Sequence, residues 1–164
     1  MIKKSEVVRY NAMARESMLI LNCSSYSKEI TDIIKLFNKI GWVFKNEKME
    51  YLPLNDDDMY SWQHEPLSYD KLFSIISQKQ KNGETIGVNL YHDKSDNGIT
   101  FLAQNTDEIL LGLDINRKTI DGVFSEIPLG GNYTDISWYI INIVAELEKS
   151  GCILELIKYQ ENIG

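Results

Sequence analysis

The sequence is poor in the residues from which disulfide frameworks and metal sites are usually built. Its 164 residues include two cysteines and two histidines. The cysteines, Cys23 and Cys152, are far apart in sequence and form neither a C-x-x-C pair nor a zinc-type spacing. They therefore indicate neither a disulfide framework nor a metal cluster, and this usage fits a reducing cytosol.

Long apolar runs are also missing. No stretch approaches the roughly 20 apolar residues that a membrane-spanning helix needs. The N-terminal residues MIKKSEVVRYNAMARES lack the apolar core of a cleavable signal peptide. We therefore expect a cytoplasmic protein that is not exported by such a signal and does not span a membrane.

The sequence has fewer basic than acidic residues, with 17 Lys and Arg against 24 Asp and Glu and a formal net charge of -7. Direct nucleic-acid binding is disfavoured, because affinity for phosphates depends on Lys and Arg. The acidity permits a basic protein partner, although moderate net charge is also an ordinary means of staying soluble. Repeats and linkers rich in Gly, Pro or Ser are absent too, so we expect residues 1–164 to form a single globular domain.

Hydrophobic periodicity and turn residues predict alternating strands and helices. The expected elements are a strand at 17–23, a helix ending at Gly41, a hairpin of 42–44 and 48–54 around Asn46-Glu47, a helix from Pro66 to 81, strands at 85–92, 98–104 and 108–115, a helix at 134–150 capped by Thr134 or Asp135, and a strand at 152–158. This order predicts an α+β fold: a two-layer sandwich with a mostly antiparallel sheet and about three helices.

The densest group of functional side chains is LNDDDMYSWQHE, residues 54–65, in the connection between a predicted strand and a predicted helix. A calcium loop would need alternating ligands and a glycine, whereas Asp56, Asp57 and Asp58 are adjacent and diverge. The H-E-x-x-H zinc motif fails after His64-Glu65. Convergence of His64, His92 and Cys23 is supported by no catalytic motif. We therefore predict no metal, no cofactor and no catalytic residue.

An interaction surface explains the same stretch in another way. Acidic residues beside Tyr60 and Trp62 are the combination that forms interface anchors with a charged rim. Alternatively, Trp62 packs inward and pins the loop to the core. The two interpretations are compatible, because an inward Trp62 would hold an outward acidic loop in a fixed shape.

The segment Tyr51–Gln63, YLPLNDDDMYSWQ, resembles a signature, roughly Y-L-P-hydrophobic-G/N-D-x-D-hydrophobic-aromatic-x-W, of immunity proteins from contact-dependent growth inhibition and related bacterial polymorphic toxin systems. Asn55 stands where that pattern more often has glycine, and Asn adopts positive φ more readily than most residues.

The resemblance implies a cytoplasmic inhibitor without enzymatic activity that neutralises a cognate toxin domain, typically a basic nuclease. We expect a monomer, although the sequence leaves the oligomeric state open. It implies Asp56, Asp57 and Asp58 as electrostatic contacts and Tyr60 and Trp62 as anchors or loop supports. Two alternatives stay open at this point: a small metal-dependent hydrolase using His64, Glu65 and the aspartates, and a non-catalytic adaptor subunit using a sheet edge.

Overall fold

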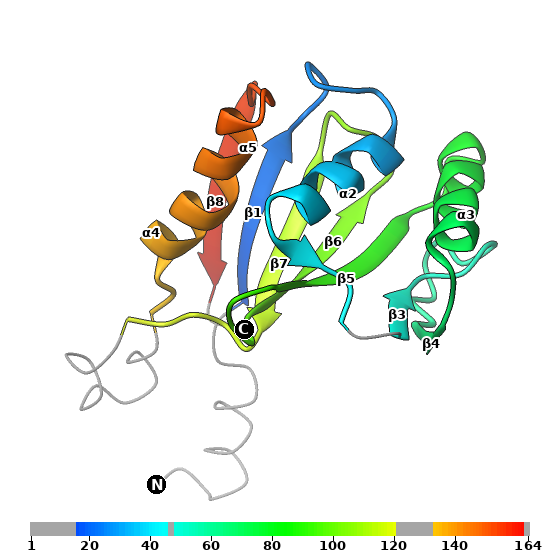
Figure 1. The fold of residues 1–164 in the computed structure, drawn as a ribbon, viewed down its shortest axis with the longest axis horizontal. Helices are drawn as coiled ribbons and strands as arrows, with labels where there is room; N and C mark the ends of the chain where they lie inside the picture. Colours follow the sequence, from blue (N-terminus) through cyan, green and yellow to red (C-terminus); the bar gives the residue numbers. More distant parts are fainter. Residues whose placement is uncertain (1–15, 46–47, 121–132, 163–164) are drawn as a thin grey trace, which may run out of the picture.

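The structure, a computed structural model, describes residues 16–45, 48–120 and 133–162 (Figure 1). The strands are β1 (Glu16–Asn22), β2 (Trp42–Val43), β3 (Lys48–Tyr51), β4 (Gln63–Pro66), β5 (Ile86–His92), β6 (Gly98–Ala103), β7 (Ile109–Ile115) and β8 (Leu156–Asn162). The helices are α2 (Ile30–Lys39), α3 (Tyr69–Lys81) and a last helix made of α4 (Ile136–Tyr139), a π-helical segment (Ile140–Val144) and α5 (Ala145–Lys149). Within these residues no helix is both long and apolar enough to cross a membrane.

The strands form one antiparallel sheet in the order β4-β3-β5-β6-β7-β1-β8, with β2 also paired to β5. The predicted meander is present as β5, β6 and β7, and β1 joins it beside β7. The α+β prediction is therefore confirmed.

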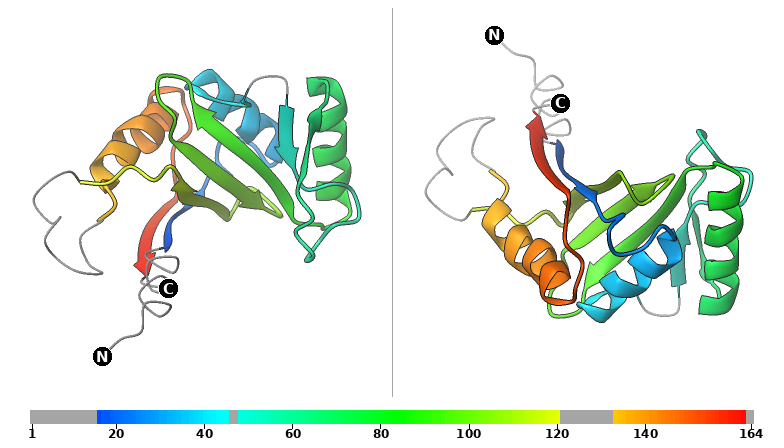
Figure 2. Two further views of the ribbon diagram at one scale, coloured as in Figure 1. Left: turned by 90° about the horizontal axis from the view of Figure 1, so that it is seen from below. Right: turned by 90° about the horizontal axis from the view of Figure 1, so that it is seen from above.

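Helix α2 and the last helix cover one face of the sheet, which gives the two layers (Figures 1 and 2). Strand alternation explains this arrangement, because Ile86, Val88 and Leu90 of β5 are fully buried and point to the same face. Helix α3 stands at the other end of the sheet, beside β3 and β4. The core lies between the layers, and α3 adds Leu72 and Ile76 to it.

The predicted hairpin of residues 42–44 and 48–54 is wrong. Strand β2 pairs with β5, with Trp42 opposite His92, whereas β3 pairs with β4 and, through Tyr51, with β5. The cause is the Trp42 indole, which is buried and donates a hydrogen bond of 3.0 Å from Nε1 to the carbonyl oxygen of Asn142 in the last helix. The turn predicted at Asn46-Glu47 lies outside the described residues.

Pro66 does not begin a helix as predicted; it ends the short edge strand β4. An edge strand tolerates proline because one side of its backbone needs no donor. Helix α3 begins at Tyr69, where the Ser68 side chain accepts a hydrogen bond of 3.3 Å from the Lys71 backbone N–H. His64 and Glu65 therefore belong to a strand, and the connecting loop ends at Trp62.

The C-terminal strand runs from Leu156 to Asn162, later than the predicted 152–158. Gly151 ends the last helix with φ of +94°, as its position predicted. The chain must then cross from the helix layer to the sheet edge, and it joins β1 where the Glu155 N–H donates to the Asn22 carbonyl over 3.2 Å. The predicted cap of this helix is confirmed at Asp135, whose side chain accepts from the Trp138 N–H.

Candidate functional site

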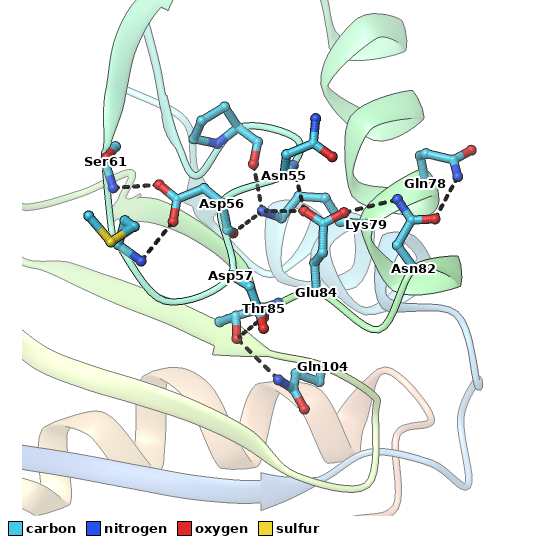
Figure 3. Close-up of polar contacts among 12 residues, drawn as sticks. Asn55, Asp56, Asp57, Ser61, Gln78, Lys79, Asn82, Glu84, Thr85 and Gln104 are labelled. Carbon is cyan, nitrogen blue, oxygen red and sulfur yellow. Dashed lines mark hydrogen bonds and ion pairs between the residues drawn. The ribbon is translucent and has the colours of Figure 1, made fainter.

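The candidate site is the loop of residues 52–62, which joins β3 to β4 and which we call the acidic loop (Figure 3). Its three consecutive aspartates have three different environments. Two polar side chains from outside the loop, Lys79 of α3 and Glu84 before β5, form hydrogen bonds with its backbone. The loop is therefore shaped by contacts with distant parts of the chain.

Asp56 is an internal support of the loop, with 6% of its surface exposed. Its Oδ1 accepts hydrogen bonds from the backbone N–H groups of Met59 (3.1 Å) and Tyr60 (3.0 Å), and its Oδ2 accepts one from Ser61 (2.6 Å). These bonds hold Tyr60 in the left-handed region at φ of 54°, which is unfavourable for a residue with a side chain. The implied role of Asp56 as an exposed electrostatic contact does not fit this geometry, because its carboxylate is already occupied.

Lys79 connects helix α3 to the acidic loop. Its side chain is fully buried, and Nζ donates to the carbonyl oxygens of Pro53 (2.6 Å) and Asp56 (2.7 Å). Nζ also lies 3.6 Å from Oε1 of Glu84. Burial lowers the pKa of Lys79, although the carboxylates of Glu84 and Asp56 oppose this shift. A buried ammonium needs such partners, and the two carbonyl groups among them belong to the acidic loop.

Glu84 completes the support. Its Oε1 accepts a hydrogen bond of 2.6 Å from the backbone N–H of Asn55, and its Oε2 accepts one of 2.9 Å from the Asn82 side chain. Asn55 has φ of 69°, which agrees with the expectation that this position needs positive φ. The first half of the loop is thus fixed by Glu84 and the second half by Asp56.

Lys79 and Glu84 were missed by sequence reasoning, but Lys79 left a signal. It follows Leu72 and Ile76 at helical spacing, so it lies on the buried stripe of α3 together with them. A lysine in such a stripe requires a buried acceptor. Nothing in the sequence marks Glu84 as its partner.

Asp57 and Asp58 remain exposed. Asp57 accepts hydrogen bonds at Oδ1 from the backbone N–H (2.8 Å) and the hydroxyl (3.2 Å) of Thr85, which ties the loop to the start of β5. Asp58 makes no hydrogen bond or ion pair with any residue that the structure describes. The exposed negative charge of the acidic loop therefore comes from these two residues.

Trp62 is half-buried and lies against β5, but it is not among the residues that form the core. Gly87 in β5 alternates with the core residues Ile86 and Val88, so it lies on the face of the sheet opposite the helices. A Cβ added to Gly87 would lie 2.7 Å from Leu52 Cδ1 and 3.0 Å from Trp62 Cη2. The missing side chain thus makes room for both ends of the loop to lie against the sheet.

Apolar side chains project from the same loop into solvent. Met59 is 78% exposed and Tyr60 is 49% exposed, and Leu54 is also exposed. Large apolar side chains held in a fixed shape beside carboxylates are typical of protein-binding surfaces. The arrangement can bind a complementary surface.

The residues proposed for a hydrolase do not converge. His64 and Glu65 are neighbours in β4 and point to opposite faces: Nδ1 of His64 lies 3.8 Å from Glu50 Oε1, whereas Glu65 accepts a hydrogen bond of 2.5 Å from the Tyr51 hydroxyl. His92 packs against Trp42 and Trp138, at ring-centroid distances of 5.1 and 5.2 Å. Among the described residues, no three His, Cys, Asp or Glu side chains form a group that could hold a metal ion.

The support role of Asp56 predicts a loss of stability in acid. Burial alone would raise the pKa of Asp56, but the three backbone hydrogen bonds and Lys79 outweigh it and bring the pKa below its ordinary value of 3.8. A lowered native pKa stabilises the fold fully above the unfolded value, and this contribution is lost as the pH falls through the native value. Asp56→Asn should therefore destabilise the protein strongly near pH 7 and progressively less below about pH 4.

Urea unfolding of both proteins between about pH 7 and about pH 3 measures this effect. Asp58→Asn is the control, since it removes an exposed carboxylate that has no partner among the described residues and should leave the free energy of unfolding almost unchanged. A difference between wild type and Asp56→Asn that stays constant over this range would contradict the assignment.

No protein-family model matches the chain, and neither the comparison with curated proteins nor that with solved structures found a match.

Proposed function

We propose that this protein is an immunity protein that binds a cognate toxin domain and neutralises it by covering its active site or substrate face. The observation that carries the proposal is the acidic loop, whose backbone is held by hydrogen bonds from Asp56, Lys79 and Glu84. Met59 and Tyr60 are exposed on the same loop. A loop ordered before binding loses little conformational entropy when it binds. The resemblance of residues 51–63 to the immunity-protein signature supports the same role.

The charge distribution indicates the partner. A formal net charge of -7, with Asp57 and Asp58 beside the apolar anchors, suits a basic surface. Nuclease domains carry such surfaces to bind phosphates. We therefore propose a basic nuclease toxin as the partner, met in the cytoplasm, with Asp57 and Asp58 steering the encounter and Met59 and Tyr60 anchoring the complex.

Co-expression with the toxin domain encoded by the adjacent reading frame tests the function. Cells should survive toxin expression only when this protein is present, and the purified proteins should form a complex whose affinity falls with salt. If no toxin is encoded there, purified basic nuclease domains replace it in the binding assay. Absence of both protection and binding would refute the proposal.

Charge reversal tests the steering role of the loop separately. Asp58→Lys should lower the association rate by roughly threefold or more at low salt, because it weakens long-range attraction. Asp96→Lys is the matched control: it makes the same charge change at an exposed aspartate in the β5–β6 turn, at the far end of β5 from Gly87. Stopped-flow association measurements compare the two. Equal rates for both variants would remove Asp58 from the interface.

A further inference from the structure

The fold brings its two cysteines together in the core. Cys23 follows β1 and Cys152 follows the last helix; both are free thiols with no exposed surface in one core cluster, and each shifts the pKa of the other. Nothing in their spacing predicted this proximity. The pair takes no part in the acidic loop.

Two hydrogen bonds hold the cysteine-bearing segments against each other. The Asn22 carbonyl, next to Cys23, accepts from the Glu155 N–H over 3.2 Å, and the Ser25 hydroxyl donates to the Ile153 carbonyl over 2.5 Å. These contacts lie on both sides of Cys23 and just after Cys152. These contacts therefore hold the two cysteine-bearing segments against each other without help from the thiols themselves.

We propose that Cys23 and Cys152 form an oxidation site, at which a hydroperoxide converts the two thiols into one intramolecular disulfide. The site is independent of the toxin-binding function. It would covalently join the end of β1 to the chain segment between the last helix and β8.

The chemistry balances with hydrogen peroxide as the oxidant. The Cys152 sulfur attacks one peroxide oxygen, the O–O bond breaks, and a sulfenic acid and one water form. The Cys23 sulfur then attacks the sulfenic sulfur and displaces its hydroxyl group, which leaves as a second water with the Cys23 proton. Two thiols are oxidised by two electrons to a disulfide, and one peroxide is reduced to two waters.

Cys152 is the group expected to react first. The hydrogen bond from Cys23 lowers the pKa of the Cys152 thiol, whereas the same bond and burial raise the pKa of Cys23. The flanking residues Gly151 and Ile153 are exposed, and residues 152–155 belong to no helix or strand. A local opening of this connection would admit peroxide to Cys152 without separating β1 from β7.

The test uses the full-length native protein and hydrogen peroxide. After treatment, the protein is unfolded and alkylated without reductant, and its mass is measured by mass spectrometry. We expect the loss of two hydrogen masses, no alkylated cysteine, and a peptide that links Cys23 to Cys152. The disulfide should raise the melting temperature by roughly 5–15 °C over the reduced protein, because it closes a long loop of the unfolded chain.

The variants Cys23→Ala and Cys152→Ala provide matched controls, with circular dichroism to verify folding. Neither should show a peroxide-dependent rise in melting temperature, and Cys23→Ala should accumulate a sulfenic acid at Cys152 that dimedone traps. Should either variant fail to fold, the mass and peptide analysis of the native protein still decides the proposal. Two alkylatable thiols after treatment, added oxygen without a disulfide, or disulfide-linked dimers would each overturn it.

Discussion

Lys79→Met should lower the free energy of unfolding by about 3–5 kcal/mol, the usual cost of removing one partner from a buried ion pair. Methionine keeps most of the volume of the side chain, so the loss reflects charge and hydrogen bonding. The carbonyl oxygens of Pro53 and Asp56 would lose their donor, and Glu84 would lose the ammonium group 3.6 Å away. Urea unfolding followed by circular dichroism measures the effect.

Lys81→Met is the matched control, since Lys81 is an exposed lysine at the end of the same helix. It should change the free energy of unfolding by no more than about 0.5 kcal/mol. Adding Glu84→Gln to Lys79→Met should recover part of the loss, because the uncompensated carboxylate is then gone. If Lys79→Met were as stable as Lys81→Met, the buried lysine would not be the support that its contacts indicate.

The fold was predictable where local patterns decide it. Helical spacing placed α2 and the last helix, alternation and turn residues placed β5 to β7, and Gly41 and Gly151 ended helices with positive φ. Pairing between distant segments was not predictable. Whether Trp42 and Val43 pair with β3 or with β5 depends on an indole hydrogen bond to Asn142, which lies about a hundred residues further along the chain.

The site shows the same limit at the scale of single residues. Asp56, Asp57 and Asp58 are chemically identical neighbours, yet one is buried, one is tied to Thr85 and one is exposed without partners among the described residues. What distinguishes them is the surface beneath the loop, to which α3 and the start of β5 contribute. Sequence reasoning located the loop, but it could not assign each aspartate its environment.

Replacing both exposed anchors, Met59→Ala with Tyr60→Ala, should weaken toxin binding by roughly 10- to 100-fold, in line with the loss of one or two interface hot spots. The stability of the free protein should change little, because both side chains project into solvent. Isothermal titration calorimetry with the cognate toxin domain measures the affinity. This expectation rests on the proposed function, so the toxin that the protein binds must be identified first.

A matched control exists on another surface. Tyr26 is 42% exposed and Ile153 is 72% exposed, close to Tyr60 at 49% and Met59 at 78%. The pair Tyr26→Ala with Ile153→Ala therefore removes similar apolar surface away from the acidic loop. An equal loss of affinity in both double variants would mean that general surface hydrophobicity, and not the loop, drives binding.

Combining the two experiments separates the shape of the loop from its contacts. Lys79→Met keeps Met59 and Tyr60 but removes the support beneath them, so the loop must be ordered at the moment of binding. At a temperature where this variant is still folded, its affinity for the toxin should fall although Met59 and Tyr60 are both present. If it bound as tightly as wild type while Met59→Ala with Tyr60→Ala did not, the toxin itself would impose the bound shape, and the buried lysine would serve folding alone.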